Sequence, residues 1–327
     1  TKSFISMQLF SLSLSTLSCQ SSGGQHVDWF YQIKQSRGFG AYFLDSVHSS
    51  FKSVPDMKEK SNPVLVTLEP LYSSKYFVAM FNDNTPTGKA GLQFAHQKGV
   101  IAFDPDSSTG IYLQHSTPIW PPLLSRELDY DNSDYGQHFA CFNIAQGQLN
   151  VLGRMLFVSR PLVYENTFDA NWLGMKAPYL LKALQGEYKA EKSSEKQTLT
   201  TRGGEEFEMF YKNKQAEEDI WARVAAAKQS NMVVETWLRD SEAQPVCEGY
   251  TVEMVKTVRF LGRSWNEGAD HAKWGVGVDA AFFCTSDINF QKSQEERGGA
   301  AICLSNTEVA AEFRNTIISL HPGLTCK

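Results

Sequence analysis

The amino-acid sequence predicts a mixed α/β (α+β) protein built from two similar halves. Strand-like segments with alternating apolar residues interleave with helical segments along the chain, a pattern typical of α/β and α+β folds. Each half carries one His-x-Lys triplet, His96–Lys98 in the first and His271–Lys273 in the second. Each triplet precedes an apolar, β-branched stretch that ends in an aspartate, at Asp104 and Asp279. This weak internal repeat indicates a site built at a pseudo-two-fold interface.

Strands account for most of the first half. Apolar and polar residues alternate from Val27, and several later segments are short, apolar and rich in β-branched residues. A turn follows from the Pro, Asp, Ser and Gly content of residues 105–110, and an acidic, irregular stretch covers 123–137. We expect strands at 27–35, 64–68, 75–82, 95–104, 111–116 and 135–144.

Two helical regions are expected near the middle of the chain. The first spans 168–186 and is interrupted by Pro178. The second spans 216–230, with acidic residues in its first turn and an apolar face. Residues 232–239 resume as a strand, and the polar segment 190–204 is predicted to be a surface loop.

Strand alternation predicts which side chains meet around the first triplet. His and Lys at positions i and i+2 of a strand point to the same face. A turn near residue 107 makes the flanking strands an antiparallel pair, in which the sequence numbers of two facing residues add up to about 214. Lys98 then faces Ser116 or a neighbour, and His115 lies beside His96 and Lys98.

The second triplet has a similar predicted environment. The strand pattern is interrupted near Asp279–Ala280, where the chain is expected to turn back. The sequence numbers of two facing residues there add up to about 559. His271 would then face Ile288, which brings Asp287 and Asn289 alongside the histidine. Each half therefore offers a titratable imidazole, a fixed positive charge and a further polar group, a combination that suits phosphate chemistry.

Other polar residues are expected to have ordinary structural roles. Asp104 and Asp279 lie at strand ends, where aspartate commonly forms turns. A zinc site from His96, His115 and His271 is conceivable by ligand type, but no HxxEH-like or CxxC spacing accompanies it. We interpret the remaining histidines as structural: His26, His48, His138 and His321.

The composition is that of a globular chain with a slight negative charge. Its 327 residues are 42% hydrophobic and 20% charged, with a net charge of −5 at pH 7, and can bury a sizeable core. This charge disfavours non-specific nucleic-acid binding at neutral pH. Seven histidines and 36 carboxylates shift the charge toward positive below about pH 5.5, so a polyanionic substrate remains compatible with an acidic working pH.

The N-terminal residues and the cysteines indicate an oxidising compartment. Residues 8–18 are apolar, small and uncharged, and they are too short to span a bilayer, so we predict a signal peptide over 1–18. The alternative is a buried first strand. No later stretch has the length of a transmembrane helix. Six widely spaced cysteines without a CxxC fit three disulfides, for which 15 pairings exist: Cys19, Cys141, Cys247, Cys284, Cys303 and Cys326.

The two triplets resemble those of the phospholipase D superfamily, and their surroundings resemble the deoxyribonuclease II family. The resemblance runs from about Cys19 to Cys326, in the order and spacing of that family. It is carried by VDWF at 27–30, LEPLY at 68–72, HQKGV at 96–100, HSTP at 115–118, YGQ at 135–137, DHAKW at 270–274 and QEERGG at 294–299.

This resemblance implies a phospholipase D-like fold and an acid nuclease. Two α/β halves, 19–165 and 166–327, are expected around a pseudo-two-fold axis, with central β-sheets flanked by helices. The implied activity is endonucleolytic hydrolysis of double-stranded DNA at acidic pH, without metal or cofactor, leaving 3′-phosphate and 5′-hydroxyl ends. A homodimer is a further candidate state. The implied disulfides are Cys19–Cys141, Cys247–Cys326 and Cys284–Cys303.

The resemblance also implies roles for individual residues. His96 corresponds to a nucleophile that forms a phosphohistidine, and His271 to a general acid. Lys98 and Lys273 correspond to a phosphate clamp. His115 is expected to orient His96 or to bind phosphate. Further substrate-binding candidates are Ser116, Asp287, Asn289 and Arg297. Asn289 is the expected counterpart of His115 in the second half. Arg297 is expected in a loop that approaches the substrate or packs against the second site.

The sequence leaves alternatives for both the location and the activity of the protein. The sequence contains no Asn-x-Ser/Thr site, which departs from glycosylated lysosomal relatives and favours secretion over a lysosomal location. A lipid-directed phosphodiesterase of the same superfamily is one alternative function, although no basic amphipathic helix supports membrane work. A secreted DNA-binding or host-interacting protein without catalytic activity is the other.

Overall fold

The computed structural model describes residues 16–73, 75–89, 91–238 and 244–326. Most of the predicted signal peptide, residues 1–15, lies outside the described residues, so that segment stays a prediction. Leu17 is buried and packs in the same apolar cluster as Cys19.

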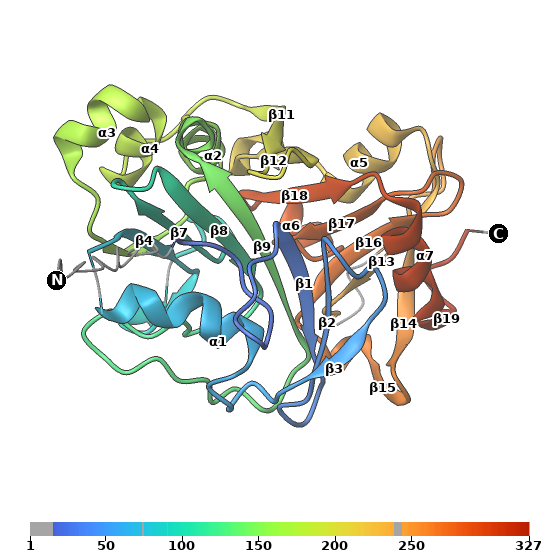
Figure 1. Cartoon of the computed structure of the whole chain (residues 1–327). Coiled ribbons are helices and arrows are strands. Elements are labelled where there is room, and N and C mark those ends of the chain that lie inside the picture. Colours follow the sequence, from blue (N-terminus) through green and yellow to red (C-terminus); the bar gives the residue numbers. More distant parts are fainter. Residues whose placement is uncertain (1–15, 74, 90, 239–243, 327) are drawn as a thin grey trace, which may run out of the picture.

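The described part of the chain forms two large sheets, one from each half (Figure 1). The first has eight strands in the order β10-β4-β7-β8-β9-β1-β2-β3. All its neighbouring strands are antiparallel. Its strands are β1 (Trp29–Lys34), β2 (Ala41–Asp45), β3 (Lys52–Val54), β4 (Phe77–Phe81), β7 (Gly99–Asp104), β8 (Thr109–His115), β9 (Gln137–Ala145) and β10 (Val163–Asn166).

The second sheet has nine strands within the described residues, in the order β11-β12-β18-β17-β16-β13-β14-β15, with β19 paired to β14. The β13–β14 pair is parallel, unlike the other pairs. Its strands are β11 (Ser194–Thr200), β12 (Glu206–Lys212), β13 (Met232–Thr236), β14 (Val252–Phe260), β15 (Arg263–Asn266), β16 (Lys273–Gly277), β17 (Phe283–Ser286), β18 (Gly299–Leu304) and β19 (Ile317–Leu320).

Helices flank these sheets (Figure 1). α1 packs in one apolar cluster of the first sheet, whereas α2, α3 and α4 pack in another on its opposite face. A two-stranded sheet of β5 (Asn84–Thr85) and β6 (Gly88–Lys89) stands apart. The helices are α1 (Pro63–Leu68), α2 (Gln146–Ser159), α3 (Ala170–Lys176), α4 (Pro178–Leu184), α5 (Ile220–Lys228), α6 (Lys292–Glu295) and α7 (Thr307–Asn315). The predicted mixed α/β class is therefore confirmed.

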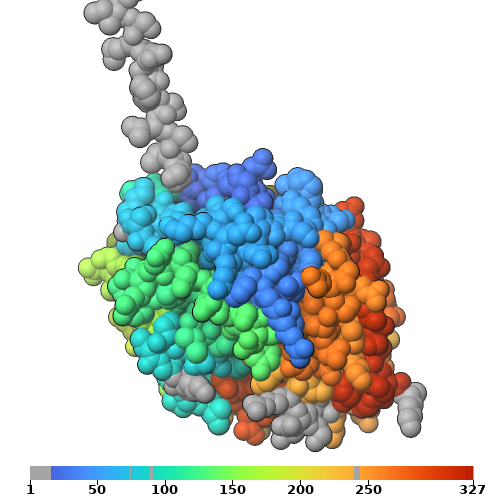
Figure 2. Space-filling view, turned by 90° about the horizontal axis from the view of Figure 1, so that it is seen from below, coloured from blue at the N-terminus to red at the C-terminus, as the bar shows by residue number. Residues whose placement is uncertain are grey.

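One aromatic-rich core joins the two halves. Tyr31 of β1 and Phe283 of β17 are both buried, and their ring centroids lie 4.7 Å apart. Trp29 of β1 likewise meets Phe207 of β12 at 6.0 Å. Buried aromatic pairs of this kind add to the apolar area removed from water. Figure 2 shows the outcome at the surface, where residues of the first half meet those of the second along a continuous boundary.

Two local predictions were wrong. Residues 64–68 form helix α1 rather than a strand, because Asn62 accepts a hydrogen bond from the Val64 N–H and Pro63 occupies the first turn. Residues 190–204 are not simply a loop, since they contain β11, an edge strand whose polar residues pair with β12 along its whole length.

Helix α2 was not anticipated by the sequence analysis. Leu149, Leu152 and Leu156 are buried at helical spacing. Gly153 weakens the local signal, because glycine is a poor helix former. The glycine is required by packing, since a Cβ there would collide with the backbone of Leu180 in α4.

The predicted strand registers agree closely with the structure. β7 and β8 pair Gly99 with Gln114, one residue from the predicted register, and the His115 N–H donates to the Lys98 carbonyl. β16 and β17 pair Trp274 with Thr285, as predicted. The predicted strand 95–104 starts later, because β7 begins at Gly99 and the first triplet precedes it.

All six cysteines lie in the described part of the chain, and they form three disulfides. The pairs are those that the family resemblance implies. They are Cys19–Cys141, Cys247–Cys326 and Cys284–Cys303.

Candidate active site

The two His-x-Lys triplets meet at one cavity between the halves. It has a volume of about 370 Å³, within the usual range for small-molecule sites. The histidine and the lysine of each triplet line this cavity, and both halves of the chain contribute lining residues. The first half contributes Asp83, Asn84, His96, Lys98, Ser116 and Pro118, and the second contributes Trp237, His271, Lys273 and Arg297.

The second half holds the imidazole of His96 in place. His96 Nδ1 lies 2.6 Å from the backbone carbonyl oxygen of Asp287, and its backbone N–H donates to the Gly298 carbonyl at 2.9 Å. The other ring nitrogen, Nε2, is 3.5 Å from a carboxylate oxygen of Asp83. The orientation of His96 therefore depends on two backbone carbonyls of the second half as well as on Asp83 of its own half.

Asp83 is a site residue that the sequence analysis missed. Its carboxylate lies 2.5 Å from Lys98 Nζ and 3.6 Å from Arg297 Nη2. Burial by itself raises the pKa of Asp83, but the charges of Lys98, His96 and Arg297 outweigh it and hold that pKa well below its usual range. Arg297 is further fixed by donating from Nε to the Phe94 carbonyl at 3.0 Å. Asp83 thus gathers the positive groups of both halves around one point.

The position of Asp83 follows from strand order. β4 pairs with β7, and Phe81 at the end of β4 faces Gly99 at the start of β7. Asp83 therefore lies next to Lys98, which immediately precedes Gly99. A run of Asn-Asp-Asn after an apolar strand, at 82–84, was the signal available in the sequence.

Residues of the first half also hold the second triplet in position. The His271 N–H donates to the Gly136 carbonyl at 2.8 Å, and the Lys273 N–H donates to His138 Nδ1 at 3.0 Å. The ring of Tyr135 stacks on His271, with centroids 4.1 Å apart and planes at 16°. The ring of Trp237, a residue of the second half, also lies against this imidazole, with centroids 4.7 Å apart and planes at 64°. His271 is therefore held within an aromatic corner.

Comparisons with known proteins cover nearly the whole chain. A family model described as deoxyribonuclease II matches residues 18–322. The chain belongs to the deoxyribonuclease II family. It is 28% identical to plancitoxin-1 of Acanthaster planci over 94% of this chain and 92% of that protein. It is also 28% identical to deoxyribonuclease-2-alpha of Rattus norvegicus, over 94% of both, and to deoxyribonuclease-2 of Caenorhabditis elegans, over 89% and 90%.

Burial shifts the pKa values of several titratable groups in this candidate site. The pKa of His96 is lowered, first by burial and then by the positive charge of Lys98. Burial and Lys273 likewise lower the pKa of His271. Burial, followed by Lys98, lowers the pKa of Lys273 to about 7. The cavity therefore resists further positive charge, a penalty that an anionic phosphate would relieve.

The other predicted site residues lie at different distances from the cavity. Ser116 lines it, donating its hydroxyl to Gln137 Oε1 at 2.5 Å. His115 is only 1% exposed and is not among the lining residues; its ring lies 5.1 Å from that of Trp120. Asn289 is also buried and is not among the lining residues. His115 is still joined to the site, because its backbone N–H donates to the Lys98 carbonyl.

Asp287 contributes through its backbone as well as its side chain. Its carbonyl contacts His96, while its carboxyl oxygen Oδ2 accepts from the Ala300 N–H at 3.2 Å. Burial raises the pKa of Asp287 to about 7. Its other oxygen, Oδ1, has no hydrogen-bond partner among the described residues. A protonated carboxyl suits this buried position better than a charged one.

The described residues contain no group of three or more His, Cys, Asp or Glu side chains placed to hold a metal ion. No helix in the described ranges has both the length and the apolar character needed to cross a membrane.

Proposed function

We propose that the chain is an acid endonuclease that hydrolyses double-stranded DNA through a phosphohistidine intermediate, without a metal ion, leaving 3′-phosphate and 5′-hydroxyl ends. The observation that carries this proposal is the convergence of His96 and His271 on one cavity with Lys98, Lys273 and Arg297. Two imidazoles supply a nucleophile and a proton donor, and the three cationic groups supply charge for a phosphate.

The first chemical step uses the two histidines on opposite sides of the phosphorus atom. His96 Nε2 attacks phosphorus while the bond to the 5′-oxygen of the next nucleotide breaks. Protonated His271 donates its proton to that leaving oxygen, which departs as a 5′-hydroxyl. The strand ending in 3′-oxygen remains joined to His96 through the phosphoryl group.

The second step releases the enzyme. Neutral His271 accepts a proton from water, and the water oxygen attacks phosphorus as the bond to His96 Nε2 breaks. The product is a 3′-phosphate, and both histidines return to their starting states. Lys98, Lys273 and Arg297 stabilise the negative charge on the non-bridging oxygens throughout.

The acidic optimum has a physical basis in the same groups. His271 must be protonated for the first step. Burial and the charges of Lys273 and Lys98 disfavour this proton, and the bound phosphate offsets those charges. Lys273, with a pKa of about 7, carries its charge below neutrality and loses it above. The surface carboxylates also repel DNA less as they become protonated.

Location and assembly are parts of the same proposal. We infer that the protein acts outside the cytosol, secreted or in lysosomes, because its three disulfides are suited to an oxidising compartment. The signal peptide, the division into catalytic halves and a homodimeric state are further elements of this proposal.

A plasmid-nicking assay at about pH 5 in excess EDTA tests the proposal. Cleavage should persist in EDTA, vanish in His96→Ala, and yield ends that phosphatase treatment must convert before a polymerase can extend them. A requirement for added Mg²⁺ or maximal activity near pH 8 contradicts the mechanism. Release of headgroup from phosphatidylcholine vesicles without DNA cleavage indicates the lipid alternative, and DNA binding without cleavage indicates the inactive one.

A further inference from the structure

A second cavity adjoins the catalytic one on the side of His271. It has a volume of about 400 Å³ and is lined by His271 and by residues of the segments 117–122 and 129–135. Pro118 and His271 line both cavities, so a ligand can extend from one into the other. We call it the flanking cavity.

The lining of the flanking cavity suits a heterocyclic ring rather than a phosphate. Ile119, Trp120, Tyr130 and Tyr135 provide apolar and aromatic groups. No lysine or arginine of the described chain is among its lining residues, whereas Asp129, Asp131 and Asp134 are, Asp131 being paired with Lys58 Nζ at 2.9 Å. Carboxylates repel a phosphate and accept hydrogen bonds from the exocyclic amino groups of bases.

Ile119 is an unusual residue at the mouth of this cavity. The residue is 57% exposed, and its backbone φ is 61°, a left-handed conformation that β-branched residues rarely adopt. Its N–H donates to the carbonyl of Asn84, at 2.6 Å, and Asn84 lines the catalytic cavity. An exposed apolar side chain is therefore fixed beside the site, in the manner of side chains that contact bases.

We propose that the flanking cavity receives the base of the nucleotide whose 5′-oxygen is the leaving group. This inference rests on the proposed function. His271 protonates that oxygen, so the nucleoside carrying it departs on the His271 side, where the flanking cavity opens. Ile119 contacts the base at the cavity mouth, and the aspartates and Asn132 face its polar edge.

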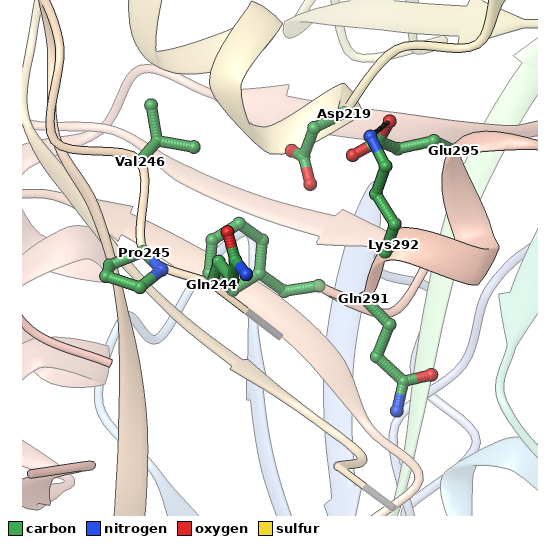
Figure 3. Close-up of a pocket in the computed structure, with 8 residues that line it drawn as sticks. Asp219, Gln244, Pro245, Val246, Gln291, Lys292 and Glu295 are labelled. Carbon is green, nitrogen blue, oxygen red and sulfur yellow. Dashed lines mark hydrogen bonds and ion pairs between the residues drawn. The ribbon is translucent and has the colours of Figure 1, made fainter. Parts of the chain in front are cut away.

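Another hollow of similar volume, about 380 Å³, provides a contrast. It is lined by Asp219, Gln291, Lys292 and Glu295 among others (Figure 3). Lys292 Nζ pairs with Glu295 there at 2.7 Å. Among the described residues it shares no lining with the catalytic cavity, so a substitution there is a suitable control.

The test compares end-labelled duplexes that carry either a mismatched base or an abasic residue at one position. Both disrupt pairing, so they differ in the presence of the base. Cleavage of the bond 5′ to that position should be about tenfold lower in the abasic duplex, the scale of one base–aromatic contact. The bond on its 3′ side should change less than about twofold by the same reasoning.

Variants connect this difference to the cavity. Ile119→Gly relieves the strained backbone, so the protein should remain folded while the mismatched-to-abasic ratio falls toward one. Asn132→Ala should lower the same ratio, whereas Val47→Ala, another exposed branched residue, and Gln291→Ala should not. The two control variants, Val47→Ala and Gln291→Ala, should also hydrolyse bis(nitrophenyl) phosphate, which has no base, like the wild type.

Failure of the base-binding inference and failure of the proposed function would give different results. Equal cleavage of the mismatched and abasic bonds by the wild type overturns the base-binding inference while leaving the nuclease proposal intact. A ratio that stays at the wild-type value in both Ile119→Gly and Asn132→Ala also overturns it. Absence of any phosphodiester cleavage overturns the proposed function itself.

Discussion

His96 Nδ1 lies 2.6 Å from the backbone carbonyl oxygen of Asp287, a residue of the other half. A carbonyl oxygen only accepts hydrogen bonds, so Nδ1 carries the proton in this contact. The lone pair of the neutral imidazole is then on Nε2, which is the nitrogen near Asp83. The second half therefore selects the tautomer in which His96 can act as a nucleophile.

The first prediction is that phosphorylation occurs on Nε2 of His96. Brief reaction with a labelled oligonucleotide at low pH, followed by quenching, should trap label on this residue. Phosphorus NMR of the isolated peptide should identify the Nε2 isomer. The label should be absent in His96→Ala. Label on Nδ1 contradicts the tautomer assignment, and label on neither histidine removes the covalent mechanism.

The second prediction concerns His271 as general acid. His271→Ala should nearly abolish DNA cleavage, because the 5′-alkoxide leaves poorly without a proton. Nitrophenolate leaves without one, so a nitrophenyl phosphodiester should partly rescue this variant and leave His96→Ala inactive. The double variant should be scarcely worse on DNA than either single one, since the residues act as a unit. The opposite rescue pattern reverses the two roles.

The third prediction concerns the lysines. Lys98→Ala or Lys273→Ala should lower kcat by about 10²–10³, the scale of one preorganised charge-stabilising group. Lys273 has a pKa of about 7, so its charge, and with it phosphate affinity, is lost as pH rises through neutrality. Lys273→Arg keeps its charge. The increase in KM above neutrality should therefore be smaller in this variant than in the wild type, and an unchanged pH dependence argues against Lys273 as its origin.

The sequence carried enough information for the fold class and for the pairing of both triplets. The break near Asp279–Ala280 predicted the β16–β17 register, and composition placed the turn between β7 and β8. Helix α1 was misassigned because its residues are mostly β-branched or leucine. The stronger signal was the Asn62-Pro63 pair before them, which caps a helix. β11 was hidden because only Leu199 of that strand is fully buried.

The missed parts of the site depend on contacts between distant segments. Asp83 belongs to the site because β4 lies beside β7, a strand order that alternation does not specify. Tyr135 flanks His271 because the segment before β9 meets the second triplet through the Gly136 carbonyl. Trp237 flanks it because β13 pairs with β16. Such contacts join segments far apart in the sequence, so a single sequence gives little local signal for them.

The last prediction concerns stability and the carboxyl of Asp287. Burial raises its pKa in the folded protein to about 7, above the ordinary value of 3.8. A raised carboxyl pKa contributes stability that is full below about pH 3.8 and is lost as pH rises through about 7. A side-chain amide has no such proton to lose, so Asp287→Asn should remove this loss. Between about pH 5 and pH 8 the free energy of unfolding should fall by about 2 kcal/mol less in Asp287→Asn than in the wild type.

Guanidinium unfolding at the two pH values, with the disulfides kept oxidised, measures this difference directly. Asp106→Asn is the matched control, because it removes one carboxylate from an exposed position and should leave the pH dependence as it is in the wild type. Comparing the change with pH, rather than stability at one pH, cancels contributions that both proteins share, including those of the buried histidines. An equal loss of stability in Asp287→Asn and the wild type means that Asp287 is already ionised in the folded protein at pH 5. In that case the carboxyl of Asp287 carries a negative charge at both pH values, and its titration takes no part in the pH dependence of the enzyme.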